Sequence, residues 1–344
     1  MKPHVKRLAA VFLALSTSIT MADENNWTKS LWGENDEIGA ANLMSADLTK
    51  EAAGLVKEGK VYSLGLILDS NVPAFPPRSM SVTILQPGQV NNSGLGPTKT
   101  TYNDDIYMGW LGIGSQIDGL GHIGVDHVYY NGFQGSEFAQ ADGLRRLGIE
   151  KVPPIVARGV LLDMAKYFGQ PMLSEGTAYT KEAIMGPAEA QGVEIRKGDV
   201  VLFHSGWLDL LKEETRDAAR YGAAEPGLGM SGAQYLTDIG VVAVGGDTWG
   251  LEAIPFEEGV GVFEVHQHLI AKNGVYILEN MVTENLAADE AYEFMFVLGH
   301  AKVKGAVQMI INPVAIRYTC IQVMDPCVHG SIAWPSRSDE NRLL

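Results

Sequence analysis

Four short apolar runs of buried-strand type constrain the fold of this chain more than any other feature of its sequence. They are residues 160–163, 199–203, 241–244 and 275–281. Between them, residues 233–239 and 262–272 show the apolar spacing of helices, with Ser231 placed to cap the first and Asn273-Gly274 to end the second. Strands mixed with helices in this order indicate an α/β or α+β fold.

The flanking regions extend the same pattern. Residues 48–56 predict a helix capped by Ser45 or Asp47, and residues 61–68 alternate like a strand. Further regular structure is expected over 287–298 and 302–310. The sequence has no internal repeat, low-complexity tract or long linker, which favours one continuous domain over residues 23–344.

The N-terminus has the order of a secretory signal peptide. Lys2, Lys6 and Arg7 precede an apolar stretch over 8–19, and small residues follow up to Ala22. The apolar stretch is too short to span a bilayer. We therefore expect residues 1–22 to be removed and the mature chain to be periplasmic or secreted. The alternative is an ordinary cytoplasmic N-terminus.

The net charge limits the kinds of partner that the chain can have, and the cysteine content bears on a disulfide. Removing the three basic residues of the signal segment takes the net charge from −15 to −18. Such an acidic chain is a poor partner for nucleic acid or an anionic membrane, so a small-molecule substrate is expected. Cys320 and Cys327 are the two cysteines, and in an exported chain a disulfide is favoured over two free thiols.

The first chemistry-bearing segment is glycine-rich and runs from Gly114 to His122. If Gln116 and Asp118 lie on an extended segment, their side chains project from the same face. Carboxylate, amide and imidazole groups together suit Zn²⁺ or Mn²⁺. Alone, this pattern also fits a polar loop whose side chains satisfy one another.

The second segment is more specific. His266 and His268 are about 200° apart around a helix, so they cannot both face one site. Apolar residues lie three and four positions from His266, which places it inward, whereas His268 falls on a polar stripe. Glu279 continues a core-facing row of the following strand, and a buried carboxylate requires a cation or strong hydrogen bonds. His266 and Glu279 therefore predict half of a metal site, or else a buried hydrogen-bonded pair.

Common catalytic signatures are absent from the sequence. There is no His-Glu-x-x-His pair and no Gly-x-Ser-x-Gly elbow. The spacing of glycines over 54–59 is that of a phosphate-binding loop, but Val61 stands where a Ser or Thr is needed. A serine hydrolase or nucleotide enzyme is therefore disfavoured.

Several blocks, in order, resemble the cyclase family, which includes kynurenine formamidase and isatin hydrolase. The blocks are Trp32 to Gly39, Arg158 to Asp163, Phe203 to Trp207, Gly246 to Trp249, and His266 to Glu279. The resemblance implies a swivelling β/β/α fold with a mixed, barrel-like sheet flanked by helices, in a homodimer or homotetramer. It also implies a metal-dependent hydrolase that opens a cyclic amide or lactone, or cleaves an N-formyl or amide bond.

The family signature, His-x-Gly-Thr-His-x-Asp-x-Pro-x-His, is only partly present. Aligned on Asp118 and His122, it puts Gly112 at the first histidine and Gln116 at a ligand histidine. The resemblance thus implies one Zn or Mn ion. Its ligands would be Asp118, His266 and Glu279, with Gln116 at a substituted ligand position, and His122 would move a proton.

Aromatic residues and one further histidine are candidates for substrate binding, although each could equally belong to the core or the surface. They are Trp110, His127, Trp207 and Trp249. Two other functions remain open at this stage. One is a metal-dependent lyase or dehydratase on the same scaffold, and the other is a non-catalytic periplasmic protein that binds a small molecule.

Overall fold

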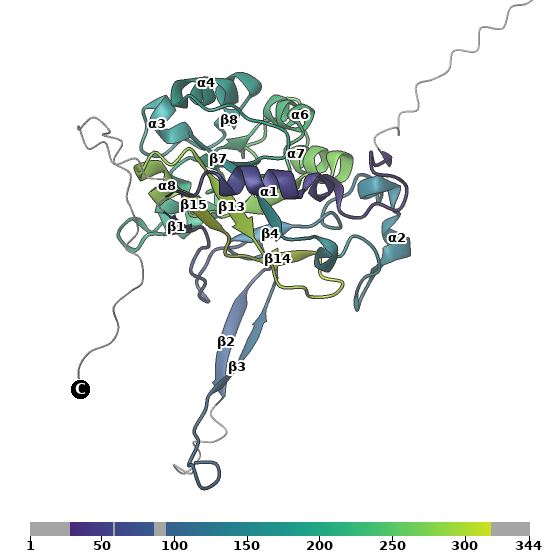
Figure 1. Ribbon diagram of the computed structural model, residues 1–344, viewed down its shortest axis with the longest axis vertical. Helices are drawn as coiled ribbons and strands as arrows, with labels where there is room; N and C mark the ends of the chain where they lie inside the picture. Colours follow the sequence, from purple (N-terminus) through teal and green to yellow (C-terminus); the bar gives the residue numbers. More distant parts are fainter. Residues whose placement is uncertain (1–27, 58, 86–93, 318–344) are drawn as a thin grey trace, which may run out of the picture.

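A nine-stranded mixed sheet forms the centre of the computed structural model, which describes residues 28–57, 59–85 and 94–317. The strand order is β1-β15-β13-β7-β9-β11-β12-β4-β14, and the sheet curls into a half-barrel with helices packed around it (Figure 1). The predicted α/β class with a barrel-like sheet flanked by helices is confirmed.

The strands of this sheet are β1 (Lys60–Ser63), β4 (Gln116–Asp118), β7 (Ile155–Asp163), β9 (Val200–His204), β11 (Ala243–Gly246), β12 (Tyr276–Glu279), β13 (Glu293–Leu298), β14 (Gln308–Ile310) and β15 (Val314–Arg317). Three two-stranded pairs are β2 (Met80–Leu85) with β3 (Asp104–Gly109), β5 (Ala139–Gln140) with β6 (Gly143–Leu144), and β8 (Ala178–Tyr179) with β10 (Gly227–Leu228).

The α-helices are α1 (Ala46–Ala53), α2 (Gly135–Phe138), α3 (Met164–Phe168), α4 (Lys181–Gln191), α5 (Ala218–Ala223), α6 (Met230–Ile239), α7 (Glu264–His266) and α8 (Glu284–Ala288). Short 3₁₀ segments are η2 (Gly39–Leu43), η4 (Tyr130–Gly132), η5 (Ile149–Lys151), η6 (Trp207–Leu211) and η7 (Glu213–Thr215), and η8 (Gln267–Lys272) is a π-helix. None of the helices within these described ranges is long and apolar enough to cross a membrane.

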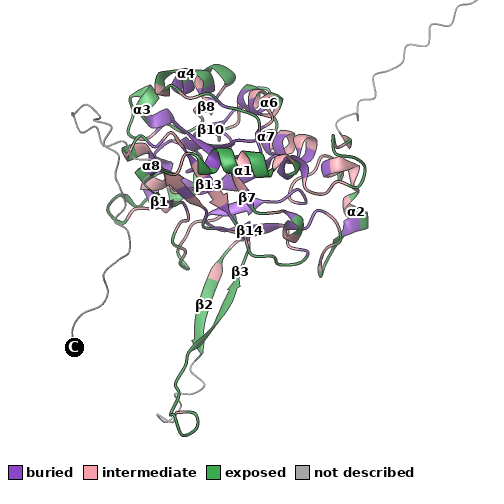
Figure 2. Ribbon diagram, in the orientation of Figure 1, coloured by how far each residue is buried: buried purple, intermediate pink, exposed green. Residues whose placement is uncertain are grey.

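The predicted apolar runs form the parallel centre of the sheet, where β7, β9, β11 and β12 lie side by side. Nearly all residues of these four strands are buried, as expected of strands covered on both faces (buried residues are purple in Figure 2). Helix α1 packs on β7 and β13, and α4 packs on β7 and α6. The four predicted strands and the helices predicted over 48–56 and 233–239 are therefore present, with ends that differ by a few residues.

Of two predicted helix caps, one is confirmed and one needs correction. Helix α1 begins at Ala46 with Ser45 as its cap, since the Ser45 hydroxyl accepts from Leu48 N at 3.2 Å. Ser231 does not cap α6, because the helix begins one residue earlier and the Ser231 hydroxyl accepts from Lys181 N instead.

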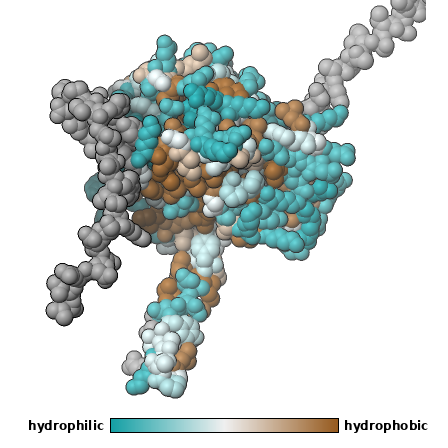
Figure 3. All heavy atoms as spheres, in the orientation of Figure 1, coloured by the Kyte–Doolittle hydropathy of each residue, from teal (hydrophilic) through white to brown (hydrophobic). Residues whose placement is uncertain are grey.

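The β2–β3 hairpin projects from the body of the molecule as a separate arm (Figure 1). Nearly all of its strand residues are exposed, and several of them are large and apolar (Figure 3). The exposed apolar residues of the two strands are Val82, Ile84, Leu85, Ile106, Tyr107 and Met108. An isolated hairpin of this kind is marginally stable in water, so a covering surface would stabilise it.

Candidate metal site

Strand β4 lies between β12 and β14 and pairs antiparallel with both. The register puts Asp118 opposite Gln308 on one side, and Gln116 opposite Glu279 on the other. Residues directly opposite in neighbouring strands, and residues two apart in one strand, share a face of the sheet. Three strands thus bring four polar side chains to one face, and the expectation that Gln116 and Asp118 share a face is met.

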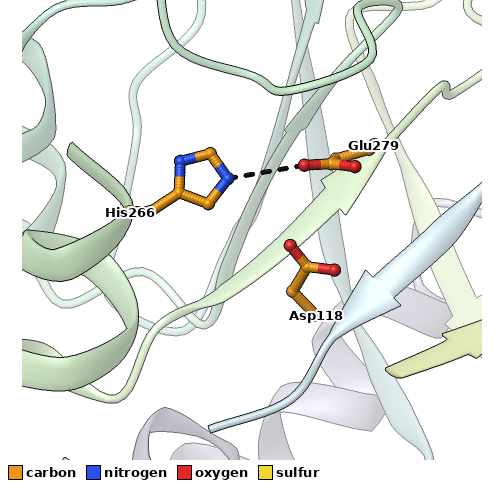
Figure 4. A group of neighbouring side chains, drawn as sticks. All are labelled: Asp118, His266 and Glu279. Carbon is orange, nitrogen blue, oxygen red and sulfur yellow. Dashed lines mark hydrogen bonds and ion pairs between the residues drawn. The ribbon is translucent and has the colours of Figure 1, made fainter. Parts of the chain in front are cut away.

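Helix α7 adds an imidazole to this face. One ligand atom each from Asp118, His266 and Glu279 lies within 4.8 Å of the others, and all three side chains are buried. His266 Nε2 is 3.4 Å from Glu279 Oε1, and the imidazole and the two carboxylates face one common space (Figure 4). Two carboxylates and one imidazole form a donor set that fits Zn²⁺ or Mn²⁺.

The two oxygens of Asp118 differ in their surroundings. Oδ1 accepts from Gln116 Nε2 at 3.0 Å and from Gln308 Nε2 at 2.6 Å. Oδ2 is buried and has no hydrogen-bond donor among the described residues. A buried carboxylate oxygen without a partner is costly, and a cation among these side chains would remove that cost. The residues present therefore fit a divalent ion.

Glu252 fixes the orientation of His266. Its Oε1 lies 2.5 Å from His266 Nδ1, which leaves Nε2 directed at Glu279. A carboxylate on the far nitrogen of a metal-binding histidine sets its tautomer and raises its basicity. The backbone here is strained, because Leu251 and Phe263 both have positive φ (60° and 53°). Such conformations in bulky residues cluster at functional sites.

Mutual charge and burial shift the pKa values of the cluster. Burial would lower the pKa of His266, but the carboxylates of Glu252 and Glu279 raise it to about 10. Burial, together with the nearby charge of Asp118, raises the pKa of Glu279 to about 7. Burial lowers the pKa of His122 below its ordinary value, with Asp118 opposing that shift. His122 is therefore neutral at pH 7 and able to accept a proton.

His122 lies at the edge of the cluster, with its Nε2 3.8 Å from Asp118 Oδ2 and 3.4 Å from Gln308 Nε2. It also lines a cavity of about 150 Å³ that opens onto His266 and Glu279. The remaining lining residues are Phe75, Arg78, Ile123, Trp249, Gly250 and Phe263. The cavity thus has an aromatic wall and a polar floor.

The loop that carries Trp249 is held by a buried carboxylate. Glu225 accepts from Trp249 N at 2.7 Å and from Gly250 N at 2.9 Å. Burial, together with the charge of Glu279, raises the pKa of Glu225 well above its ordinary value. Trp249 packs on Phe75, with ring centroids 6.0 Å apart, and Phe75 in turn contacts the edge of Phe263.

The structure separates the other predicted binding residues from this cavity. Trp249 lines it, but Trp207 is buried in a different cluster, where its indole donates to Tyr221 O. Trp110 is exposed beyond the end of β3, and His127 is exposed in a turn. None of these three residues lines the cavity, and their part in substrate binding stays a prediction.

His268 and His266 do not face the same site, as predicted: His268 contacts Thr237, whereas His266 contacts Glu252 and Glu279. His268 is half-buried rather than solvated, since its Nε2 bonds with Thr237 Oγ1 at 2.9 Å. Cys320, Cys327 and the whole of residues 1–22 lie outside the described residues, so the disulfide and the signal peptide stay predictions.

Three polar residues of the site were not found from the sequence. Glu252 stands between two apolar residues in a loop, a weak signal for a buried carboxylate. Arg78 lies just before the hairpin and reaches back to donate to Gly112 O at 2.7 Å. Gln308 meets Asp118 only through strand pairing 190 residues apart in the chain. No local pattern reveals the last two.

Comparison with known proteins agrees with this architecture. The chain matches the Cyclase family over residues 46–253. A solved structure of a cyclase is 28% identical, covers 83% of this chain and 96% of its own, and superposes with a TM-score of 0.75. No match exists among proteins with curated descriptions.

Two isatin hydrolases share the fold at lower identity. Isatin hydrolase A from Ralstonia solanacearum is 17% identical, with a TM-score of 0.58 over 80% of this chain and 98% of its own. An isatin hydrolase bound to the product analogue thioisatinate is 19% identical, with a TM-score of 0.55 over 79% of this chain and 99% of its own.

Proposed function

Since the chain belongs to the cyclase family, we propose that it is a metal-dependent hydrolase of a small molecule. The bond is a cyclic amide or lactone, or an N-formyl or other amide. The observation that supports this proposal is the buried cluster of Asp118, His266 and Glu279, in which Asp118 Oδ2 has no donor among the described residues. His266 and Glu279 of this cluster line a cavity that His122 also lines.

Each residue of the site then has a defined task. Asp118, His266 and Glu279 would hold one Zn²⁺ or Mn²⁺ ion. Such an ion supplies a Lewis acid for a carbonyl and lowers the pKa of water. Glu252 keeps His266 Nε2 free to bind by holding Nδ1. His122, neutral at pH 7, accepts and returns a proton at Nε2.

The cavity walls favour a compact substrate with a flat ring. Phe75, Trp249 and Phe263 provide aromatic faces and exclude water from the polar floor. Their arrangement supports an aromatic or fused-ring substrate rather than a flexible chain.

Arg78 supports hydrolysis rather than elimination. Its guanidinium lines the cavity, and its one hydrogen bond among the described residues goes to a backbone carbonyl. Opening an amide or lactone with water creates a carboxylate, and a guanidinium binds carboxylates well. Arg78 would therefore bind the product group that only hydrolysis generates.

The test is reaction of the purified, metal-loaded protein with cyclic amides and lactones in water labelled with ¹⁸O. We expect one labelled oxygen in the carboxylate of the product. Turnover without label would instead identify a lyase or dehydratase. Binding without turnover, with no metal at stoichiometric level, would identify a binding protein.

We also propose that the protein is exported and forms a homodimer or homotetramer. The exposed apolar hairpin β2–β3 supports assembly, because a second copy would cover it. Light scattering should give twice or four times the chain mass, and the Ile84→Ser, Met108→Ser double variant should lower it. A monomeric parent protein would contradict this proposal.

A further inference from the structure

Gln308 occupies the space next to Asp118 that a side chain at position 112 would fill. A Cβ placed on Gly112 would lie 2.4 Å from Gln308 Oε1 and 2.7 Å from its Cδ, distances at which something must move. Gly112 aligns with the first histidine of the family signature. The Gln308 carboxamide, contributed by β14, thus stands where that side chain would begin.

Two carboxamides converge on one oxygen of Asp118. Gln308 and Gln116 both donate to Oδ1, and both are buried. The register explains this, because Gln308 lies directly opposite Asp118 while Gln116 precedes it by two residues on the same face. Oδ1 therefore has two donors, and Oδ2 alone is left for a cation.

We infer that Gln308, with Gln116, takes the place of a second metal ion at Asp118 and limits the site to one ion. An ion at Oδ1 would have to displace two amide donors and find room where the Gln308 carboxamide lies. Here the carboxamides of Gln116 and Gln308 donate to Oδ1. The Gln308 carboxamide also fills the space beside Asp118, and Gly112, which has no side chain, leaves room for it. Gln308 therefore determines how many metal ions the site binds per chain. This inference rests on the proposed metal site.

The isosteric variant Gln308→Glu tests it without changing the volume of the side chain. It would place a carboxylate between Asp118 Oδ1 and His122 Nε2, which lies 3.4 Å from Gln308 Nε2. Those three groups form a new set of oxygen and nitrogen ligands. The full chain would be stripped with chelator, reloaded with Zn²⁺ or Mn²⁺, and its metal content measured by mass spectrometry and calorimetric titration.

We expect one ion per chain in the parent protein and two in Gln308→Glu. Gln140→Glu, at an exposed position in β5, is the matched control and should bind one. Two ions in the parent protein, or one in Gln308→Glu, would overturn the inference while leaving the metal site intact. No bound ion in the parent protein would overturn the proposed function itself.

A second measurement tests the steric pairing of Gly112 with Gln308. Gly112→Ala should lower the melting temperature of the parent protein, because its Cβ would displace the Gln308 carboxamide from its buried hydrogen bond to Asp118 Oδ1. In a Gln308→Ala background the same change should lower it by less than half as much. Equal losses in both backgrounds would show that Gln308 does not occupy the space of residue 112.

Discussion

Asp247 and Asp118 are both buried carboxylates beside a histidine, but they differ in how many hydrogen bonds their oxygens accept. Asp247, after β11, accepts from Ser205 N, Ser205 Oγ and Gly206 N at 2.6–3.1 Å, and it lies 3.4 Å from His204 Nδ1. Every oxygen of that carboxylate has a donor.

Asp118 is equally buried, yet its Oδ2 has no donor in the described part of the chain. Both carboxylates stand near a histidine, so proximity to an imidazole does not distinguish a metal ligand from a structural group. What distinguishes the two carboxylates is that one oxygen of Asp118 has no donor among the described residues, whereas both oxygens of Asp247 have donors. This difference is the reason for proposing Asp118 as a metal ligand, whereas Asp247 supports the β9–η6 turn.

Asp118→Asn should have the largest effect. The amide oxygen can take the place of Oδ1 beside the two glutamines, which leaves an NH₂ group where the metal ligand was. We expect loss of bound metal and a fall in activity on the order of 10³-fold or more, since several kcal/mol of transition-state stabilisation disappear. Metal analysis and kinetics would measure both. Retained metal would refute the assignment of Asp118.

Asp247→Asn should show the reverse pattern. Its new NH₂ group would face backbone N–H groups, so the free energy of unfolding should fall by about 3 kcal/mol. Bound metal should stay at the parent level. Urea denaturation with metal analysis would measure both. A loss of metal at unchanged stability would abolish the contrast between the two carboxylates.

Glu252→Gln tests whether the Glu252 carboxylate, which lies against His266 Nδ1, supports metal binding by His266. The amide keeps the shape of the side chain but loses the charge that orients the imidazole. We expect metal affinity to fall roughly 10–100-fold, as for other residues that support a ligand histidine. Calorimetric titration would give the change. A matched change, Glu264→Gln at the half-buried start of α7, should leave affinity unaltered, because Glu264 accepts from Gly261 N and does not contact the cluster.

Metal binding should release protons, and the number of protons released per ion should fall as the pH rises. Before binding, His266, with a pKa of about 10, carries a proton that it must lose to become a ligand. Glu279, with a pKa of about 7, is half protonated at pH 7. We therefore expect release of about one and a half protons at pH 7 and about one at pH 8.5.

Calorimetry in buffers of different ionisation enthalpy measures this release. A release that grows with pH, or none at pH 7, would contradict the electrostatic description of the site.

His268→Ala should have the smallest effect. It removes the contacts of His268 Nε2 with Thr237 Oγ1 and with Asn273 Nδ2, worth about 1 kcal/mol together, and leaves metal content unchanged. His266→Ala, by contrast, should abolish metal binding. Thermal unfolding and metal analysis of both variants would test the helical-face argument, which fails if His268→Ala loses metal and His266→Ala does not.

Local periodicity predicted the strands and helices but left α/β and α+β open, and the resemblance to the cyclase family implied the barrel-like sheet and the set of ligands. The apolar runs specify the parallel strands, and the spacing around His266 and Glu279 turns both inward. Gln116 was placed on the correct face of β4, but its amide nitrogen bonds to Asp118, which no spacing reveals.

The rest depends on contacts between distant segments. Gln308 reaches Asp118 through strand pairing, and Arg78 and Phe75 reach the cavity from the base of the hairpin. Trp110 and His127 appeared suitable because they flank the first motif, but the chain turns away from the site on both sides of it. Closeness in sequence is a poor guide where glycines allow sharp turns.

The most direct test of the central claim is a crystal structure of the metal-loaded protein with an anomalous-scattering map. We predict one peak, about 2.0–2.3 Å from Asp118 Oδ2, His266 Nε2 and a carboxylate oxygen of Glu279. A map without a peak among these three side chains, in crystals of protein that contains metal, would contradict the account.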